Sequence, residues 1–200
     1  MRFIYLKEID STQLYLIKAI EEEVLRPPAC VWSEYQTDGI GSRGNSWIGE
    51  RGNLFFSFSY GKNEFDFVPL QSLSIYFGWL FKSTLNSLGS KAVLKWPNDI
   101  YLNKKIGGVI TKVTKNAVIC GIGLNTTKSV GEFESLDIKI KNDKILKAYF
   151  ETLSKKPSWE YVIENYKREF DATKSFFNID AELLNDGSII KNQKRVYSGR

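Results

Sequence analysis

The sequence contains no histidine and only two cysteines, Cys30 and Cys120, among its 200 residues. Both cysteines lie in strand-like runs without metal-ligand spacing, which argues against a zinc site, and the lack of histidine excludes a histidine-based catalytic triad. Apolar residues never run uninterrupted for the roughly 18 positions that a membrane span requires. The N-terminus carries Lys7, Glu8 and Asp10 where a signal peptide needs an apolar stretch, so we expect a cytoplasmic protein without membrane contact.

The chain also lacks a strong excess of one charge, because 28 basic and 23 acidic residues give a net charge of only +5. The lysines are spread along the chain. Without an arginine-rich block or a known binding motif, a nucleic-acid partner is unsupported, whereas a nucleotide or an acidic protein fits equally well. The apolar fraction of 42% and the aromatic fraction of 14% are those of a folded globular protein. The length suits one compact domain, alone or with a small appendage.

Hydrophobic periodicity predicts an alternation of strands and helices with one long loop. Asp10 and Ser11 are helix-capping residues, and Pro27 and Pro28 are expected to end the first helix. Five glycines within TDGIGSRGNSWIGERGN predict a loop, and Pro157 separates two amphipathic helices. The expected strands are residues 2–9, 30–36, 54–60, 92–96, 106–113 and 117–121, with short ones at 188–190 and 195–197; the expected helices are 11–24, 68–88 and two between 137 and 170.

The loop glycines Gly39, Gly41 and Gly44 surround Arg43, and such a segment lets backbone N–H groups approach an anion closely. No helical pattern follows, as in a Rossmann fingerprint, and no GK[ST] closes the segment, as in a Walker loop. A surface turn is the alternative interpretation.

The run LKWPNDIYLNKKIGGVI places Asn98 and Asp99 directly after a strand, where side chains are often presented to a site. Pro-Asn-Asp is also ordinary turn chemistry. Lys105 precedes the adjacent glycines 107 and 108, which indicate either the close approach of a ligand or a β-bulge.

Four separated segments together resemble the signature of the biotin protein ligase catalytic domain. They are Ser11-Thr12-Gln13, EYQTDGIGSRGNSW at 34–47, KWPND at 95–99 with KIGG at 105–108, and GIGLN at 121–125. The resemblance covers about residues 1–170. It implies an α+β fold with a mixed central sheet packed on one side by helices, like class II aminoacyl-tRNA synthetases. It also implies a catalytic domain at 1–171 and a reduced C-terminal extension at 172–200, as a short hairpin remnant.

The resemblance implies a two-step ligase reaction. Biotin and ATP form biotinyl-5′-adenylate and pyrophosphate, and a carrier lysine then attacks the adenylate. Two anions meet in the first step, so positive charge must be positioned beforehand, and Lys105 matches the family's catalytic lysine. Asp99 is our choice for holding Mg²⁺, Asn98 would orient that carboxylate or the nucleotide, and Lys95 is a further catalytic candidate.

Biotin combines apolar rings and an apolar chain with a polar ureido head, so its pocket should be mostly apolar with a few fixed hydrogen bonds. The resemblance implies that the following residues bind it: Ser11, Thr12, Gln13, Gln36, Gly39, Gly41, Lys105, Gly108 and Gly121. For ATP it implies Arg43, Asn98, Asn125 and Trp47, the last stacking on adenine. The alternative interpretations are a helix N-cap for Ser11 and a core tryptophan for Trp47.

The chain departs from the family pattern in its loop and at its ends. Residues 37–52 would be the lid that keeps water from the adenylate, but Ile40, Ser42 and Asn45 stand where the family pattern G-R-G-R-x-G-R has arginine. Only Arg43 remains, one place later than expected. We also expect no DNA-binding helix-turn-helix, hence no repressor activity, and no complete SH3-like C-terminal domain.

The expected partner is the biotin carboxyl carrier protein of a carboxylase such as acetyl-CoA carboxylase, and the resemblance leaves a homodimer open. Two other functions compete. A lipoate-protein ligase or octanoyltransferase of related fold also has a lysine in a K-x-x-G-like context, but its pocket motif with histidine is absent here. The other is a non-catalytic basic module that docks an anionic partner.

If Arg43 replaces the missing loop arginines, Arg43→Ala should cost about 2–4 kcal/mol of transition-state stabilisation in ATP use. Steady-state adenylation kinetics measure this loss. Unchanged kinetics would remove Arg43 from the mechanism.

Overall fold

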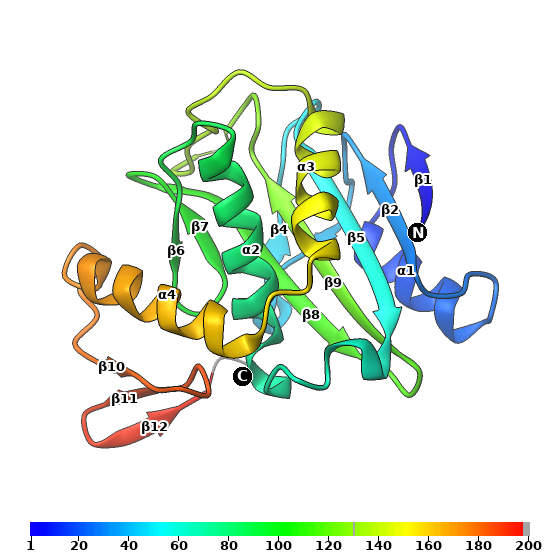
Figure 1. Ribbon diagram of the computed structural model, residues 1–200. Coiled ribbons are helices and arrows are strands. Elements are labelled where there is room, and N and C mark those ends of the chain that lie inside the picture. The colour runs from blue at the N-terminus through cyan, green and yellow to red at the C-terminus, as the bar shows by residue number, and fades with distance from the viewer. Residues whose placement is uncertain (130, 198–200) are drawn as a thin grey trace.

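The computed structural model describes residues 1–129 and 131–197, in which a seven-stranded sheet forms the centre of the molecule (Figure 1). The strand order is β1-β2-β5-β9-β8-β7-β6. β1 runs parallel to β2 and every other neighbouring pair is antiparallel, so the sheet is mixed, as expected. Its strands are β1 (Arg2–Leu6), β2 (Ala29–Ser33), β5 (Leu54–Gly61), β6 (Val93–Lys95), β7 (Asp99–Tyr101), β8 (Lys105–Val113) and β9 (Ala117–Leu124).

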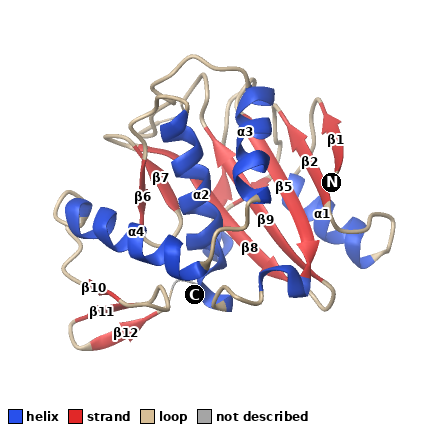
Figure 2. Cartoon of the chain, in the orientation of Figure 1, coloured by secondary structure: helices blue, strands red, loops and turns tan. Residues whose placement is uncertain are grey.

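The helices lie on both faces of this sheet (Figure 2). The described α-helices are α1 (Thr12–Glu21), α2 (Leu73–Ser87), α3 (Asn142–Ser154) and α4 (Trp159–Thr173). The three longer helices α2, α3 and α4 share the main core on one face, while α1 packs on β2, β5 and β9 from the other face with a smaller core of its own. The open part of that second face is where a site can form.

The sequence of β5, LFFSFSYG, explains why the two faces differ. Side chains alternate across a strand, so Leu54, Phe56 and Phe58 enter the main core, where rings from α2 and α3 surround them. Ser57 and Ser59 point to the opposite face and are fully buried there. One strand therefore supplies both an aromatic core and a polar wall.

Three segments differ from the sequence-based expectation. The loop at 37–52 contains a two-stranded ribbon, β3 (Gly39–Ile40) with β4 (Ser46–Trp47), because the turn at 42–44 places Arg43 and Gly44 at positive φ. The helix expected from residue 68 begins at 73, after a 3₁₀ turn that follows Pro69. The short strand β7 was not predicted, since three residues are too few for an alternating pattern.

The tail forms three strands instead of one hairpin: β10 (Glu182–Leu183), β11 (Ile189–Lys191) and β12 (Lys194–Val196). This small sheet is attached to the body by hydrogen bonds to backbone carbonyls. Trp96 Nε1 donates to the carbonyl of Gly187 (2.9 Å), and Trp159 Nε1 donates to that of Asn185 (2.8 Å). The expected domain boundary at 171 falls inside α4, which ends at Thr173.

Both cysteines are buried in the main core, and burial raises the pKa of each thiol well above its usual range. A thiolate nucleophile is therefore unavailable at neutral pH. Within the described residues no helix has the length and apolarity needed to cross a membrane.

The tail sheet should lose stability in acid through Asp186. Burial alone would raise the pKa of this carboxyl, but hydrogen bonds from Ser188 and the ion pair with Arg195 outweigh it and hold the pKa below its usual value. Because the folded-state pKa is lowered, the ionised carboxylate stabilises the fold at pH values above its ordinary pKa of 3.8. This stabilisation is lost as the pH falls through the folded-state pKa.

We expect Asp186→Asn to lower the free energy of unfolding by about 0.5–1 kcal/mol at neutral pH, as for partly exposed ion pairs. At a pH below the folded-state pKa of Asp186 the substitution should have no effect. Urea unfolding of both proteins across this pH range measures the difference. A gap between them that stays constant down to acid pH would contradict the assignment.

Candidate active site

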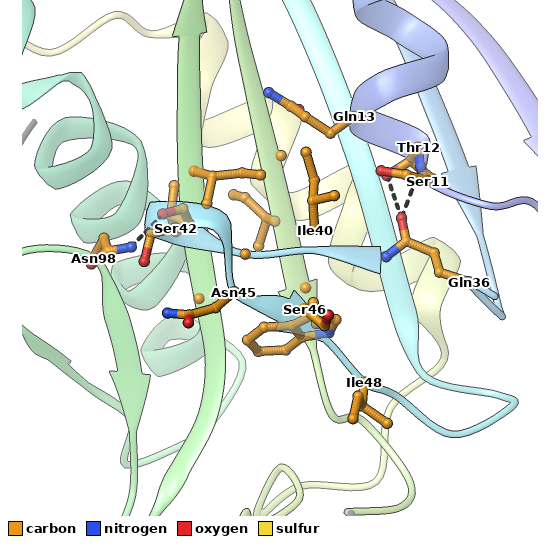
Figure 3. Close-up of a pocket in the computed structure, with 18 of the residues that line it drawn as sticks. Ser11, Thr12, Gln13, Gln36, Ile40, Ser42, Asn45, Ser46, Ile48 and Asn98 are labelled. Atoms are coloured by element: carbon orange, nitrogen blue, oxygen red, sulfur yellow. Dashed lines mark hydrogen bonds between the residues drawn. The ribbon is translucent and has the colours of Figure 1, made fainter. Parts of the chain in front are cut away.

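A cavity of 370 Å³ opens between the N-terminus of α1, the ribbon β3–β4 and the sheet strands β7, β8 and β9 (Figure 3). Figure 3 shows Ser11, Thr12 and Gln36 on one side of it, Asn98 on the other, and Ile40 of the ribbon between them. Residues expected from the sequence that line the cavity are Ser11, Thr12, Gln13, Gln36, Gly41, Trp47, Asn98, Asp99, Lys105, Gly108 and Gly121.

The polar end of the cavity is held by hydrogen bonds around Thr12. Gln36 Oε1 accepts from the backbone N–H of Thr12 (2.8 Å) and from its hydroxyl (3.0 Å), and the same hydroxyl lies 3.0 Å from Ser57 Oγ. Ser11 caps α1 by accepting from the N–H of Leu14 (3.3 Å) and, although only 2% exposed, also lines the cavity, so one side chain can serve both roles. These groups can form hydrogen bonds with a ligand that carries several donors and acceptors.

Gln13 lies beside this group with a buried oxygen, Oε1, that has no hydrogen-bond partner among the described residues. A Cβ at Gly121 would lie 2.6 Å from that oxygen and 3.1 Å from Ser57 Oγ. Only a glycine therefore leaves room here, and an unpaired buried acceptor marks a place where a ligand donor is favoured.

Trp47 packs on a pair of glycines that face each other across two strands. Gly108 of β8 is in register with Gly123 of β9. A Cβ at Gly123 would lie 2.7 Å from Trp47 Cε2, and one at Gly108 would lie 3.2 Å from Cζ3. The glycines thus form a flat floor for the indole, which is an aromatic wall of the cavity and not a residue of the main core.

Lys105 and Asp99 come together at the other end of the cavity. Lys105 Nζ lies 2.7 Å from Asp99 Oδ1, and each side chain is 25% exposed. The ammonium is also 5.4 Å from the centre of the Trp47 ring. Asn98 Nδ2 donates to the carbonyl of Val109 (2.7 Å), which fixes the turn that carries Asp99. A partly buried ion pair of this kind can exchange one partner for a charged ligand.

Four expected residues lie outside this cavity. Arg43 lines a neighbouring cavity of 430 Å³, which shares Gly41, Asn98 and Asp99 with the first. Gly39 belongs to the ribbon itself, where it pairs with Trp47, and a Cβ there would be 2.5 Å from the carbonyl oxygen of Trp47.

The other two are held by protein contacts. Lys95 Nζ lies 3.4 Å from Tyr101 Oη and over the rings of Tyr101 and Phe177. Asn125 is 2% exposed, and its amide bonds to Asn53 and to the carbonyl of Glu134.

Several cavity residues were not anticipated from the sequence, chiefly Ile40, Ser57, Ile110 and Phe133. The serine alternation in LFFSFSYG could have indicated Ser57 once the buried face was known. Phe133 follows no pattern, because it lies in an irregular segment after β9 that only the tertiary structure brings to Trp47.

No cluster of three or more Cys, Asp or Glu side chains that could hold a metal occurs in the part of the chain that the structure describes. A closed protein cage is therefore absent there. A single carboxylate such as Asp99 still suits Mg²⁺, which keeps several waters and binds substrate phosphates.

Residues 5–125 match the model of the Biotin/lipoate A/B protein ligase family. Among curated proteins, the Bifunctional ligase/repressor BirA of Salmonella typhimurium is 36% identical over 125 residues, which is 58% of this chain and 38% of that protein. The chain thus matches well under half the length of this relative.

Solved structures of similar fold, among them the two that follow, match almost the whole chain. Biotin Acetyl Coenzyme A Carboxylase Synthetase from Helicobacter pylori, with bound biotinylated ATP, has a TM-score of 0.89 and 34% identity and covers 98% of this chain and 99% of that one. Biotin protein ligase from Aquifex aeolicus, in complex with biotin and ATP, has a TM-score of 0.80 and 23% identity over 99% and 96% of the two chains. The second likeness shows the fold alone.

The glycine floor makes a structural prediction. Gly123→Ala should push Trp47 off the sheet and destabilise the fold by about 1–3 kcal/mol, as overpacking does. Urea unfolding and a red shift of tryptophan emission measure the two effects. Gly61→Ala is the matched control, since its added Cβ would meet its nearest neighbour, Glu64 Oε1, at an ordinary 3.4 Å. Equal behaviour of the two variants would refute the close packing.

Proposed function

Because the chain belongs to the biotin/lipoate A/B protein ligase family, we propose that it is a biotin protein ligase, which joins biotin to a lysine of a carrier protein at the expense of ATP. The first step forms biotinyl-5′-adenylate and releases pyrophosphate. The second transfers biotin to the ε-amine of the carrier lysine and releases AMP.

The observation that carries this proposal is the division of one cavity into two polar ends with an apolar middle. Hydrogen-bonding side chains around Thr12 occupy one end, and the ion pair of Lys105 with Asp99 occupies the other. Ile40 and Ile110 line the cavity as well. Biotin has the same sequence of properties, with a ureido head, apolar rings and chain, and a terminal carboxylate.

At the ureido end, Thr12 and Gln36 are already oriented by their mutual hydrogen bonds, and Gln13 offers an acceptor without a protein partner among the described residues. A ureido group has two N–H donors and one carbonyl acceptor, so it can satisfy that oxygen. Fixed groups of this kind bind without first paying the entropy of ordering themselves.

At the carboxylate end, Lys105 supplies the positive charge that lets two anions meet. Its ammonium is held by Asp99 at 2.7 Å and so is positioned before substrates arrive. As biotin's carboxylate attacks the α-phosphate, negative charge accumulates on the phosphate oxygens, and Lys105 stabilises it. Asp99 would hold Mg²⁺, which neutralises phosphate charge when bound, and Asn98 would orient that carboxylate or the nucleotide.

The ribbon β3–β4 has the place of the expected lid, because Ile40, Gly41 and Trp47 all line the cavity from above the sheet. Trp47 offers a ring for adenine, and Arg43 lies beside the adjoining cavity, where the leaving phosphates can be bound. Keeping water from the adenylate preserves it for the carrier lysine. The net charge of +5 suits an acidic carrier, for which the biotin carboxyl carrier protein of a carboxylase is our candidate.

Biotin-dependent exchange of labelled pyrophosphate into ATP tests the proposal, with lipoate in a parallel reaction. Biotin should support exchange and lipoate should not, since lipoate has no ureido group to bond to the polar side chains around Thr12 and Gln13. Exchange with lipoate alone would support the related lipoate ligase activity, and no exchange with either would favour a binding module.

Lys105→Gln should lower the exchange rate roughly 10²–10³-fold, the loss expected when one preorganised stabilising group is removed. Its fold should persist, because the side chain is 25% exposed. Lys104→Gln is the matched control, since the neighbouring side chain is exposed and lies outside the cavity. Equal rates for both variants would contradict the role of Lys105.

A further inference from the structure

Strand β6 lies at the edge of the sheet, and helix α4 packs beside it (Figure 1). The only strand that β6 pairs with is β7, and both strands are three residues long. β7 begins at Asp99, which forms the ion pair with Lys105 (2.7 Å). Two such short strands make few ladder hydrogen bonds of their own, so the position of Asp99 also depends on what holds β6 from outside.

Two side chains of α4 bind the outer side of β6 at Leu94. Glu169 Oε1 accepts from the backbone N–H of Leu94 (2.7 Å), and Tyr166 Oη donates to the carbonyl of the same residue (3.4 Å). An edge strand without cover leaves such N–H and C=O groups unpaired. At this residue α4 therefore takes the place of a neighbouring strand.

Lys82 of α2 fixes Glu169 in this position. Its ammonium forms an ion pair with Glu169 Oε2, and the two side chains are only 9% and 15% exposed. Both carboxylate oxygens of Glu169 are thus used, one by Lys82 and the other by β6. A buried ion pair adds little net stability after desolvation, but it can specify one arrangement of the elements that it joins.

A second anchor follows at Trp96, directly after β6. Trp96 Nε1 donates to the carbonyl of Gly187 (2.9 Å), in the turn between β10 and β11. This turn is also bonded to α4, because Trp159 Nε1 donates to the carbonyl of Asn185 (2.8 Å). The chain that leads from β6 to Asp99 is therefore attached at two successive points to elements outside the sheet.

On the basis of the proposed function, we infer that Glu169 is a positioning residue for adenylate formation. Through the N–H of Leu94 it fixes β6, and together with the anchor at Trp96 it holds the β6–β7 hairpin where Asp99 meets Lys105. Neither Glu169 nor Trp96 lines the cavity, so both act on the reaction through the hairpin. A misplacement of about 1 Å in a reacting group can lower a rate roughly 10²-fold, which makes such anchors kinetically important.

Two double variants that differ in a single group test the inference. Lys82→Met with Glu169→Gln removes the ion pair but keeps an oxygen that can accept from Leu94. Lys82→Met with Glu169→Leu removes the ion pair and this acceptor together. The variant with Gln should retain most of the kcat of biotin-dependent pyrophosphate exchange, whereas the variant with Leu should lose roughly 10–10²-fold.

Two further measurements separate positioning from a loss of fold. The number of biotin sites, by equilibrium dialysis, should be equal in the two variants, because the hydrogen bonds around Thr12 involve α1, β5 and Gln36. Amides of residues 93–101 should exchange with solvent faster in the variant with Leu. Equal kcat in the two variants would overturn the inference, as would a fall in kcat that only matches a loss of biotin sites.

Should the variant with Leu not fold, Trp96→Phe tests the second anchor and Trp159→Phe is the matched control. Each substitution keeps an aromatic ring and removes one N–H donor to the same turn, but only Trp96 joins that turn to β6. Trp96→Phe should lower kcat several-fold and Trp159→Phe should not; equal kcat would overturn the inference.

The proposed function fails separately, if the unaltered protein shows no exchange. Amide exchange of residues 93–101 needs no turnover, so it tests the anchors in that case as well, and equal protection in the variants with Gln and Leu would then overturn the inference.

Discussion

The site depends on the absence of side chains at Gly108, Gly121 and Gly123, on the face of β8 and β9 opposite the main core. In a sheet, alternate residues line each face, so three glycines on one face leave the backbone open to whatever lies above it. Gln13 and Trp47 approach this surface more closely than any Cβ would allow. The cavity, its aromatic wall and its unpaired glutamine oxygen all follow from this one constraint.

Around that floor the polar groups are organised before any substrate arrives. Thr12, Gln36 and Ser57 bond to one another, and Lys105 is paired with Asp99. Such arrangements lose little entropy on binding, and in the proposed reaction the charge needed in the transition state would already be in place. The two ends are built on different elements, the N-terminus of α1 and the strands β7 and β8 of the central sheet.

The supporting contacts come from segments far away in the sequence. The tail sheet bonds to Trp96, next to the turn that carries Asn98 and Asp99. Asn53, which follows the loop at 37–52, bonds to the residues that follow β9. Buried amides with fully used donors and acceptors give a unique arrangement, because any alternative would leave polar groups unsatisfied.

The sequence by itself determined most of the secondary-structure elements and which residue types are available for the chemistry. The alternation in LFFSFSYG, the cap at Ser11 and the break at Pro157 depend on local geometry, so they predicted β5, α1 and the gap between α3 and α4. Short motifs such as KWPND, KIGG and GIGLN indicated a family because each combines specific residue types at a fixed, close spacing. Lys105 and Asp99 were singled out in this way before their contact was known.

Tertiary structure alone decided which of these residues meet. The ribbon within 37–52 needed a turn at positive φ, and β7 needed β6 and β8 as partners. The burial of Asn125 depends on a hydrogen bond to Asn53, about 70 residues away in the sequence. The position of Phe133 beside Trp47 depends on an irregular backbone segment. Long-range contacts leave no periodic trace in a sequence, since each is a single pairing whose partner is specified only when the whole chain is folded.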